Sequence, residues 1–252
     1  MDYNKITLLT SSNPKTAKSD KLFSDKNGKP YKTYILYMSP SKNNSFGFNV
    51  CPKATKTCIL GCLANSGHGG KFEVVKTARI KKADNFRINK DLFMRQLFAE
   101  ITLLTIKHAN DNLCIRLNGT SDLKFENIKV LGFNNIFEAF PNVQFYDYTK
   151  VFDRLKTKLP SNYHLTFSRN EENEDDCKKA LDLGFNVAVV FDSVNFPDTY
   201  LNRKVINGDL HDLRFIDEPN TIIGLTYKKM TFKGAKEVNE EMLKNGFVVS
   251  TK

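Results

Sequence analysis

Long apolar runs are missing from this sequence. No stretch approaches the roughly 18 residues that are needed to span a bilayer, which excludes a transmembrane helix. The segment from Met1 to Asp20 is polar and lacks the apolar core of a secretory signal peptide. Tryptophan is also absent, yet 20 phenylalanines and a hydrophobic fraction of 40% supply ample apolar surface for a core. We therefore expect a globular cytoplasmic protein without a membrane partner.

Cysteines are few, and their number is odd. The chain has five, of which three fall within the twelve residues from Cys51 to Cys62. The cytoplasm keeps thiols reduced, so a disulfide framework is not expected there. The clustered cysteines are therefore candidates for metal ligands or reactive thiols.

Negative charge is scarce in the N-terminal part of the chain. Residues 1–110 contain 19 lysines and arginines against 7 aspartates and glutamates, a net charge of +12, whereas residues 111–252 carry −2. A basic region of this size favours a polyanionic partner, either nucleic acid or a phosphorylated substrate. A lysine-rich surface that only keeps the protein soluble explains the same residues equally well.

The order of apolar segments predicts one α/β domain. Residues 1–30 are interrupted by Pro14, Gly28 and Pro30 and are expected to form an irregular N-terminal arm. From residue 31 to 252, short apolar runs alternate with amphipathic segments, which is typical of parallel βα units. The number of such units and the length of the chain predict a single parallel (βα) barrel, TIM-like or partial.

The boundaries of the expected elements follow from the hydrophobic pattern. Strands are expected at residues 34–38, 113–117, 143–146, 163–167, 187–191, 205–206, 222–225 and 247–249. Helices are expected at residues 84–108, 133–140, 173–183 and 235–245.

Three cysteines form a C-x6-C-x3-C motif directly after the first expected strand. If Cys58 and Cys62 belong to one helix, they are one turn apart, and the preceding loop can bring Cys51 back to meet them. Lys53 and Lys56 are expected to lower the pKa of these thiols. Three protein ligands leave one coordination position open, which is typical of a catalytic metal site.

The identity of the metal is left open by the motif. A [4Fe–4S] cluster with one free iron would use the open position. Zinc is the alternative, because His68 can complete a structural Cys₃His site. A chance cluster of three unligated cysteines is a third interpretation.

Polar residues follow several of the expected strands, at the barrel end where active residues lie. Parallel strands end on the same face, so these side chains are expected around a common cavity near the cysteines. They are Asn118, Asp122, Asp147, Lys150, Ser168 and Asp192. The charged members, Asp122, Asp147, Lys150 and Asp192, are the candidate catalytic groups, and Ser168 is a candidate for cofactor binding.

A strand followed by a three-cysteine loop at the start of a parallel barrel resembles the radical S-adenosylmethionine enzymes. The resemblance implies that Cys51, Cys58 and Cys62 hold a cluster whose free iron meets S-adenosylmethionine. It also implies a cofactor-binding role for Asn118, Gly119 and Thr120, which occupy the place of the glycine-rich segment after the second strand. The cysteine spacing differs from the usual C-x3-C-x2-C.

Residues 51–70, 78–80 and 117–122 also look like a bacteriophage-encoded family whose function is not settled. Together, the two resemblances imply a phage-type iron–sulfur enzyme of the host cytoplasm that acts on a nucleotide, nucleic acid or peptide. One alternative is a zinc-stabilised barrel that exchanges bases in nucleic acid, as transglycosylases do, with Asp122, Asp147 or Asp192 as the nucleophile. The other is a non-catalytic nucleic-acid-binding protein.

Overall fold

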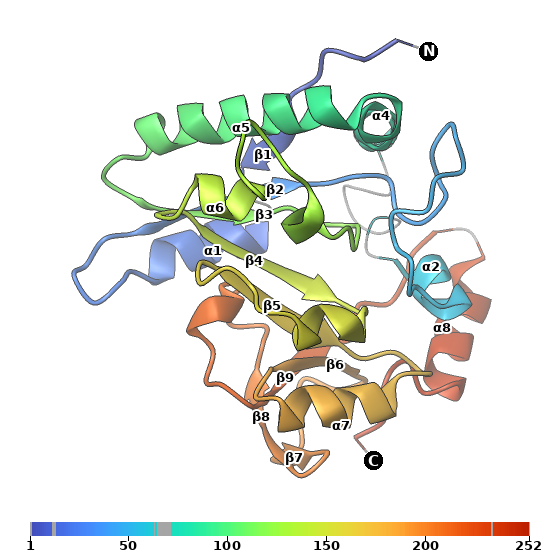
Figure 1. The fold of residues 1–252 in the computed structure, drawn as a ribbon. Helices are drawn as coiled ribbons and strands as arrows, with labels where there is room; N and C mark the ends of the chain where they lie inside the picture. The colour runs from blue at the N-terminus through green and yellow to red at the C-terminus, as the bar shows by residue number, and fades with distance from the viewer. Residues whose placement is uncertain (1, 12–13, 63, 65–71, 233, 252) are drawn as a thin grey trace.

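One nine-stranded sheet forms the centre of the described chain in this computed structural model, which describes residues 2–11, 14–62, 64, 72–232 and 234–251 (Figure 1). The strands are β1 Leu9–Ser11, β2 Tyr31–Leu36, β3 Asn112–Arg116, β4 Gln144–Thr149, β5 Tyr163–Ser168, β6 Val187–Phe191, β7 Thr199–Tyr200, β8 Arg203–Asn207 and β9 Ile222–Thr226.

The helices vary widely in length. The longer ones are α1 Pro14–Leu22, α4 Glu73–Ile88, α5 Lys90–Lys107, α7 Glu174–Asp182 and α8 Ala235–Lys244. The short ones are α2 Lys56–Leu60, α6 Ile136–Ala139 and the 3₁₀ turns η2 Phe125–Asn127, η3 Phe152–Lys156 and η4 Arg214–Ile216. Within the described residues, none of these helices has the length and apolar character that crossing a membrane requires.

The sheet is mostly parallel and open. Strands β2 to β6 pair in chain order, and β9 and β8 continue the parallel array beyond β6. Two antiparallel strands end it, with β1 beside β2 and β7 beside β8. The outer sides of β2 and β8 are therefore already paired, and these strands cannot close on each other. The prediction of a mostly parallel α/β sheet is confirmed, but its closed, TIM-like form is not.

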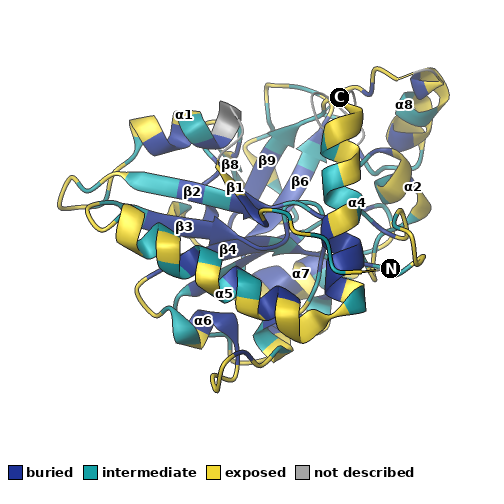
Figure 2. Cartoon of the chain, turned by 90° about the horizontal axis from the view of Figure 1, so that it is seen from above, coloured by how far each residue is buried: buried dark blue, intermediate teal, exposed yellow. Residues whose placement is uncertain are grey.

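One face of the sheet carries the apolar core. Leu113 and Ile115 of β3, Phe145 of β4 and Leu165 of β5 are members of one buried cluster that also includes Leu97 of α5. Helices α4, α5 and α6 lie over this face with their exposed sides turned outward (Figure 2). Leu113 and Ile115 share this face because side chains two residues apart on a strand point to the same side.

The opposite face is more polar and is covered by α1 and by the chain that leads into η4. Arg116 of β3 forms a 2.7 Å ion pair with Asp212 and lies over the rings of Tyr146 and Tyr148. The backbone N–H of Asp212 also donates a 2.9 Å hydrogen bond to the hydroxyl of Ser19 in α1. This bond joins the two segments that cover the face.

The expected helix over 84–108 is instead two helices. Asn89 separates α4 from α5 with φ −147° and ψ 88°, which are not helical angles. Its side chain accepts a hydrogen bond from the N–H of Leu92 and so caps α5. The apolar period alone did not reveal the break, because both helices present apolar faces to the same sheet.

The prediction of an irregular arm over residues 1–30 is wrong for β1 and α1. The Glu100 carboxylate accepts the N–H groups of Leu8 and Leu9, and Lys82 donates to the Leu8 carbonyl. These partners lie about 70 to 90 residues away in the sequence, so local pattern does not show them. The predicted strand at 247–249 forms only a bridge between Val249 and Phe191.

Candidate functional site

The cysteine loop leaves the sheet at the carboxyl end of β2. Helices α2 and α8 lie at the end of the molecule toward which β4 points (Figure 1). Cys51 is fixed there by its neighbours: the N–H of Ser41 lies 3.4 Å from its Sγ, and its thiol lies 3.6 Å from the carbonyl of Thr120. The loop after β2 therefore meets the loop after β3 at Cys51.

The other two cysteines are placed by α2. Thr55 caps this helix by accepting a 3.1 Å hydrogen bond from the N–H of Cys58. The helix ends at Leu60, so Cys62 lies beyond its C-terminus, and the two cysteines do not share one helical face as expected. Asn245, which follows α8, donates to the hydroxyl of Thr57 at 2.6 Å and ties α2 to the C-terminal helix.

The three thiols lie within electrostatic reach of one another. Burial, the largest cause, raises the pKa of Cys51 to about 12, and the Cys62 and Cys58 thiols act in the same direction. Burial also raises the pKa of Cys62, against the lowering effect of Arg79 and Lys150. Without a metal, the Cys51 and Cys62 thiols are therefore protonated near neutral pH.

The expected lowering of the thiol pKa by Lys53 and Lys56 is wrong for Cys51 and Cys62. Taking a thiolate out of water costs more than these cations return. The positive groups that do act on Cys62 are Arg79 and Lys150.

Three cysteines have the right chemistry to bind a metal as thiolates, but their side chains are not arranged in a coordination geometry. Among the described residues, no three His, Cys, Asp or Glu side chains are positioned together as metal ligands. His68 lies outside the described residues. The N–H of Ser41 that faces Cys51 Sγ is the kind of outer contact that stabilises a bound thiolate, and the donor set of three cysteines fits an iron–sulfur or zinc centre.

Five of the predicted strand-end residues are joined by hydrogen bonds, two as a pair and three as a chain. Asp147 accepts hydrogen bonds from the backbone and side-chain nitrogens of Asn118 at 2.8 and 3.2 Å. Asp122 accepts from the N–H of Lys150, whose ammonium donates to the Ser168 hydroxyl at 2.6 Å. The loops after β3, β4 and β5 are thereby joined.

Most of these polar groups are occupied by the protein itself. Asp147 is fully buried, and burial, its largest influence, raises its pKa to about 6. The side-chain oxygen of Asn118 accepts from Ser121 and Leu123. Asp147 and Asn118 therefore hold the loops in place and are closed to a ligand. Lys150, a candidate catalytic residue in these loops, also lines a cavity.

Gly119 and Thr120 connect the same loop to β2. The hydroxyl of Thr120 donates to the Met38 carbonyl at 2.5 Å. A methyl group on Gly119 would lie 2.6 Å from a side-chain carbon of Ile35 and 2.7 Å from the ring of Tyr37. Only glycine permits this approach, so this segment positions the Cys51 loop.

Asp192 lies apart from the other candidates. It is exposed, and its carboxylate accepts hydrogen bonds from Ser250 and Thr251. Its role in the described structure is to hold the end of the chain against β6.

Two arginines at the site were given no role by the sequence analysis. Arg154 is fully buried and pairs with Asp122 at 2.7 Å and with Glu126 at 2.7 Å. Arg79 of α4 donates to the Ala64 carbonyl at 3.1 Å. For Arg154 the available signal was an arginine among apolar neighbours in residues 151–155, a position where burial requires partners.

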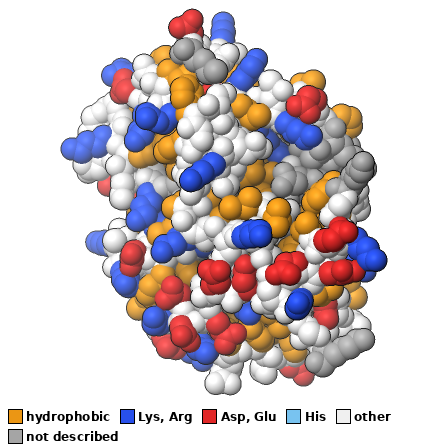
Figure 3. Space-filling model, turned by 90° about the vertical axis from the view of Figure 1, so that its right-hand side faces the viewer, with side chains coloured by type: hydrophobic (Ala, Val, Ile, Leu, Met, Phe, Trp, Pro, Cys, Tyr) orange, Lys and Arg blue, Asp and Glu red, His pale blue; other side chains and the backbone are white. Residues whose placement is uncertain are grey.

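The face that carries α2 and α8 is divided by charge (Figure 3). Acidic side chains gather in its lower part, hydrophobic ones form a band across its middle, and lysines and arginines are spread above and beside them. A nucleic-acid partner for the basic N-terminal part of the chain stays a prediction.

Comparison with known proteins identifies a family. A family model described as gene product 88 matches residues 7–243. No curated protein and no solved structure matches the chain. The match supports the phage-type part of the resemblance and leaves the radical S-adenosylmethionine part without a counterpart.

Proposed function

The chain belongs to the gene product 88 family, and from that premise we propose that it is a phage-type metalloenzyme that holds an iron–sulfur cluster on Cys51, Cys58 and Cys62. When bound, such a cluster supplies one-electron chemistry to S-adenosylmethionine through its open iron position. The proposed substrate is a nucleotide, a nucleic acid or a peptide.

The observation that carries the proposal is the contact between Cys51 and the loop after β3. The thiol lies 3.6 Å from the Thr120 carbonyl, at the carboxyl edge of parallel strands that follow one another in chain order. That edge is where parallel α/β folds present catalytic loops. The cysteines are therefore supported as functional ligands by their place in the fold as well as by their number.

The residues around the cysteines have defined tasks in this proposal. Ser41 directs its N–H toward the Cys51 sulfur and disperses negative charge there. Arg79 and Lys150 favour the thiolate form of Cys62, which is the form that binds metal. Thr55 fixes the helix start that orients Cys58.

The proposal is tested by anaerobic reconstitution with iron and sulfide. Cys51→Ala, Cys58→Ala and Cys62→Ala are each expected to lose bound iron and acid-labile sulfide, together with the broad absorbance of a cluster. Cys114→Ala and Cys177→Ala are matched controls, because both cysteines are buried away from the motif. These controls should retain the cluster.

Binding of zinc in place of a cluster would contradict the proposal. Stoichiometric zinc that is lost on substituting any of the three cysteines or His68 would replace the cluster with a structural zinc site. If neither metal binds and the cysteine variants unfold at the same denaturant concentration as the wild type, the proposed function is wrong.

A further inference from the structure

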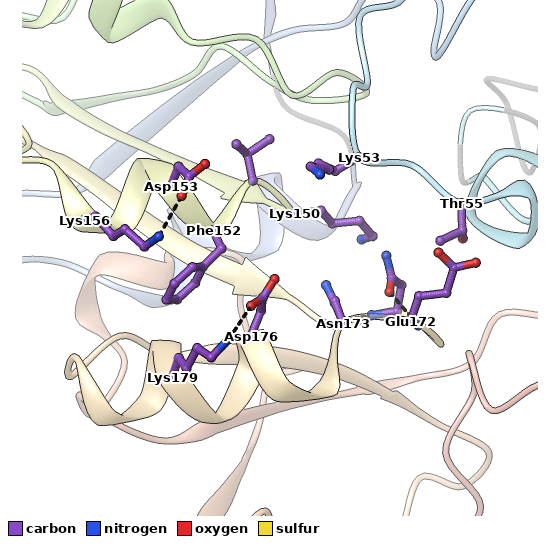
Figure 4. A pocket seen from close by; sticks show the side chains of 12 residues that line it. Lys53, Thr55, Lys150, Phe152, Asp153, Lys156, Glu172, Asn173, Asp176 and Lys179 are labelled. Atoms are coloured by element: carbon purple, nitrogen blue, oxygen red, sulfur yellow. Dashed lines mark hydrogen bonds and ion pairs between the residues drawn. The ribbon is translucent and has the colours of Figure 1, made fainter.

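A cavity of about 540 Å³ lies next to the cysteine loop, between η3 and α7 (Figure 4). This volume falls within the roughly 300–1,000 Å³ that is usual for small-molecule sites. Four lysines line it, namely Lys53 of the cysteine loop, Lys150 after β4, Lys156 of η3 and Lys179 of α7. Its lining is thus more cationic than that of an ordinary apolar pocket.

The lysines at one end of the cavity are already paired. Lys156 lies 2.8 Å from Asp153, and Lys179 lies 3.3 Å from Asp176. Both ammonium groups also lie over the ring of Phe152, at 5.0 and 5.8 Å from its centre. These contacts form a fixed wall whose charge is largely neutralised.

The lysines at the other end are Lys53 and Lys150. Within the described part of the chain, neither Lys53 nor Lys150 forms an ion pair. The ammonium of Lys150 is held by the Ser168 hydroxyl at 2.6 Å. Glu172 also lines this end, and its carboxylate is turned toward Thr55 (Figure 4). Two lysines therefore line this end together with Glu172, and the Asp153 carboxylate lies within electrostatic reach of Lys53.

A buried amide adds a neutral donor to the same lining. Asn170 is only 3% exposed, and its Oδ1 accepts a 2.9 Å hydrogen bond from the N–H of Glu172. Because an N–H group donates to this atom, it is the oxygen of the Asn170 amide, and the other atom is the nitrogen. Its Nδ2 has no hydrogen-bond partner among the residues that the structure describes. Because Asn170 lines the cavity, this amide nitrogen can donate a hydrogen bond to a ligand bound there.

We propose that this end of the cavity binds the phosphoryl group of a small phosphorylated substrate such as a nucleotide. Lys53 and Lys150 supply the charge and Asn170 a directed hydrogen bond, the combination that phosphate oxygens require. Lys53 belongs to the cysteine loop, so the bound molecule lies beside the cysteines. The assignment of that molecule as the substrate rests on the proposed function, whereas its binding does not require a cluster.

Isothermal titration calorimetry with adenosine monophosphate tests the site on the full chain. Lys53→Gln and Lys150→Gln should each weaken binding about 10-fold or more, because each removes a charge-assisted hydrogen bond. Asn170→Asp keeps the oxygen that caps Glu172 but replaces the donor with a second oxygen, and should weaken binding at least as much. Lys158→Gln, an exposed lysine outside the cavity, is the control and should bind as the wild type does.

The choice of ligand separates the possible sources of the phosphate. Inorganic phosphate that competes with adenosine monophosphate supports a phosphoryl site, and adenosine should not compete. Equal binding of adenosine and its monophosphate, binding of an oligonucleotide but no mononucleotide, or unchanged binding by all three variants would overturn the inference. Iron and sulfide content is measured on the same preparations, so a failure of the cluster and a failure of the phosphoryl site are seen independently.

Discussion

Asp147 shows at the scale of one residue how burial changes a carboxyl group. Its oxygens accept from Asn118 and, at 3.0 Å, from the Tyr163 hydroxyl. These bonds favour the charged form, yet burial outweighs them and the pKa rises to about 6. The protein therefore holds a carboxyl that changes charge within the range in which cells operate.

This shift predicts a pH dependence of stability. Between its unfolded pKa of about 3.9 and its folded pKa of about 6, Asp147 binds its proton more tightly in the folded state. The free energy of unfolding should therefore fall as pH rises through this window, by an amount on the order of 3 kcal/mol. The measurement is urea unfolding at intervals from pH 4 to 7.

Asp147→Asn supplies the control for this prediction, because an amide does not titrate. The difference in unfolding free energy between wild type and variant should change across the window and be constant above it. A constant difference from pH 4 to 7 would show that burial does not control this carboxyl.

The residue scale also shows how far the sequence could predict the site. The cysteine motif and the strand-end positions could be read from the sequence. The motif lies within twelve consecutive residues, and each apolar strand ends where polar residues begin. Arg154 could not be recognised in this way, since its partners Asp122 and Glu126 lie 32 and 28 residues away and only the fold brings them together. The raised thiol pKa of Cys51 escaped for the same reason, because burial depends on neighbours that are distant in the chain.

Gly119 acts at the scale of elements, because it sets the distance between the loop after β3 and the end of β2. Gly119→Ala places a methyl group against Ile35 and Tyr37, neither of which can move away easily. We expect a loss of about 1–3 kcal/mol in the free energy of unfolding. Cluster content per folded molecule should fall as well, because Cys51 is positioned by this loop.

Gly61→Ala is a matched control for this substitution. There the new methyl group meets the end of the buried Met242 side chain, which is more flexible than the Ile35 side chain or the Tyr37 ring. Denaturant unfolding should show a smaller loss than Gly119→Ala. Equal losses for both variants would show that the close packing at Gly119 has no special part in joining the two loops.

Strands and helices could be predicted where one hydrophobic pattern dominates a segment of the sequence. The central strands are continuous apolar runs buried on both faces, so β3, β5, β6 and β9 lie close to their expected positions. β1 has only three residues, too few for a period, and is held by Glu100 and Lys82. The open form of the sheet was not predictable either, because it depends on which strands occupy the edges.

At the scale of the whole molecule, one apolar cluster runs from Leu8 to Ile222 and joins helices to most of the sheet. We expect a single cooperative unfolding transition, with coincident midpoints from far-ultraviolet circular dichroism and tyrosine fluorescence. Leu36→Ala, in β2, should shift both midpoints together and cost about 2–5 kcal/mol. Two separate transitions, or a shift in one probe alone, would show that the cluster does not unite the chain.

The position of β9 between β6 and β8 has a consequence for synthesis of the protein. β9 comes last of the strands in the chain, yet it pairs with both neighbours. A nascent chain leaving the ribosome therefore exposes the free edge of β6 until residue 226 has emerged. Unpaired edges of apolar strands are sites of aggregation. The interval between the emergence of residues 191 and 226 from the ribosome is thus when this chain most needs a chaperone.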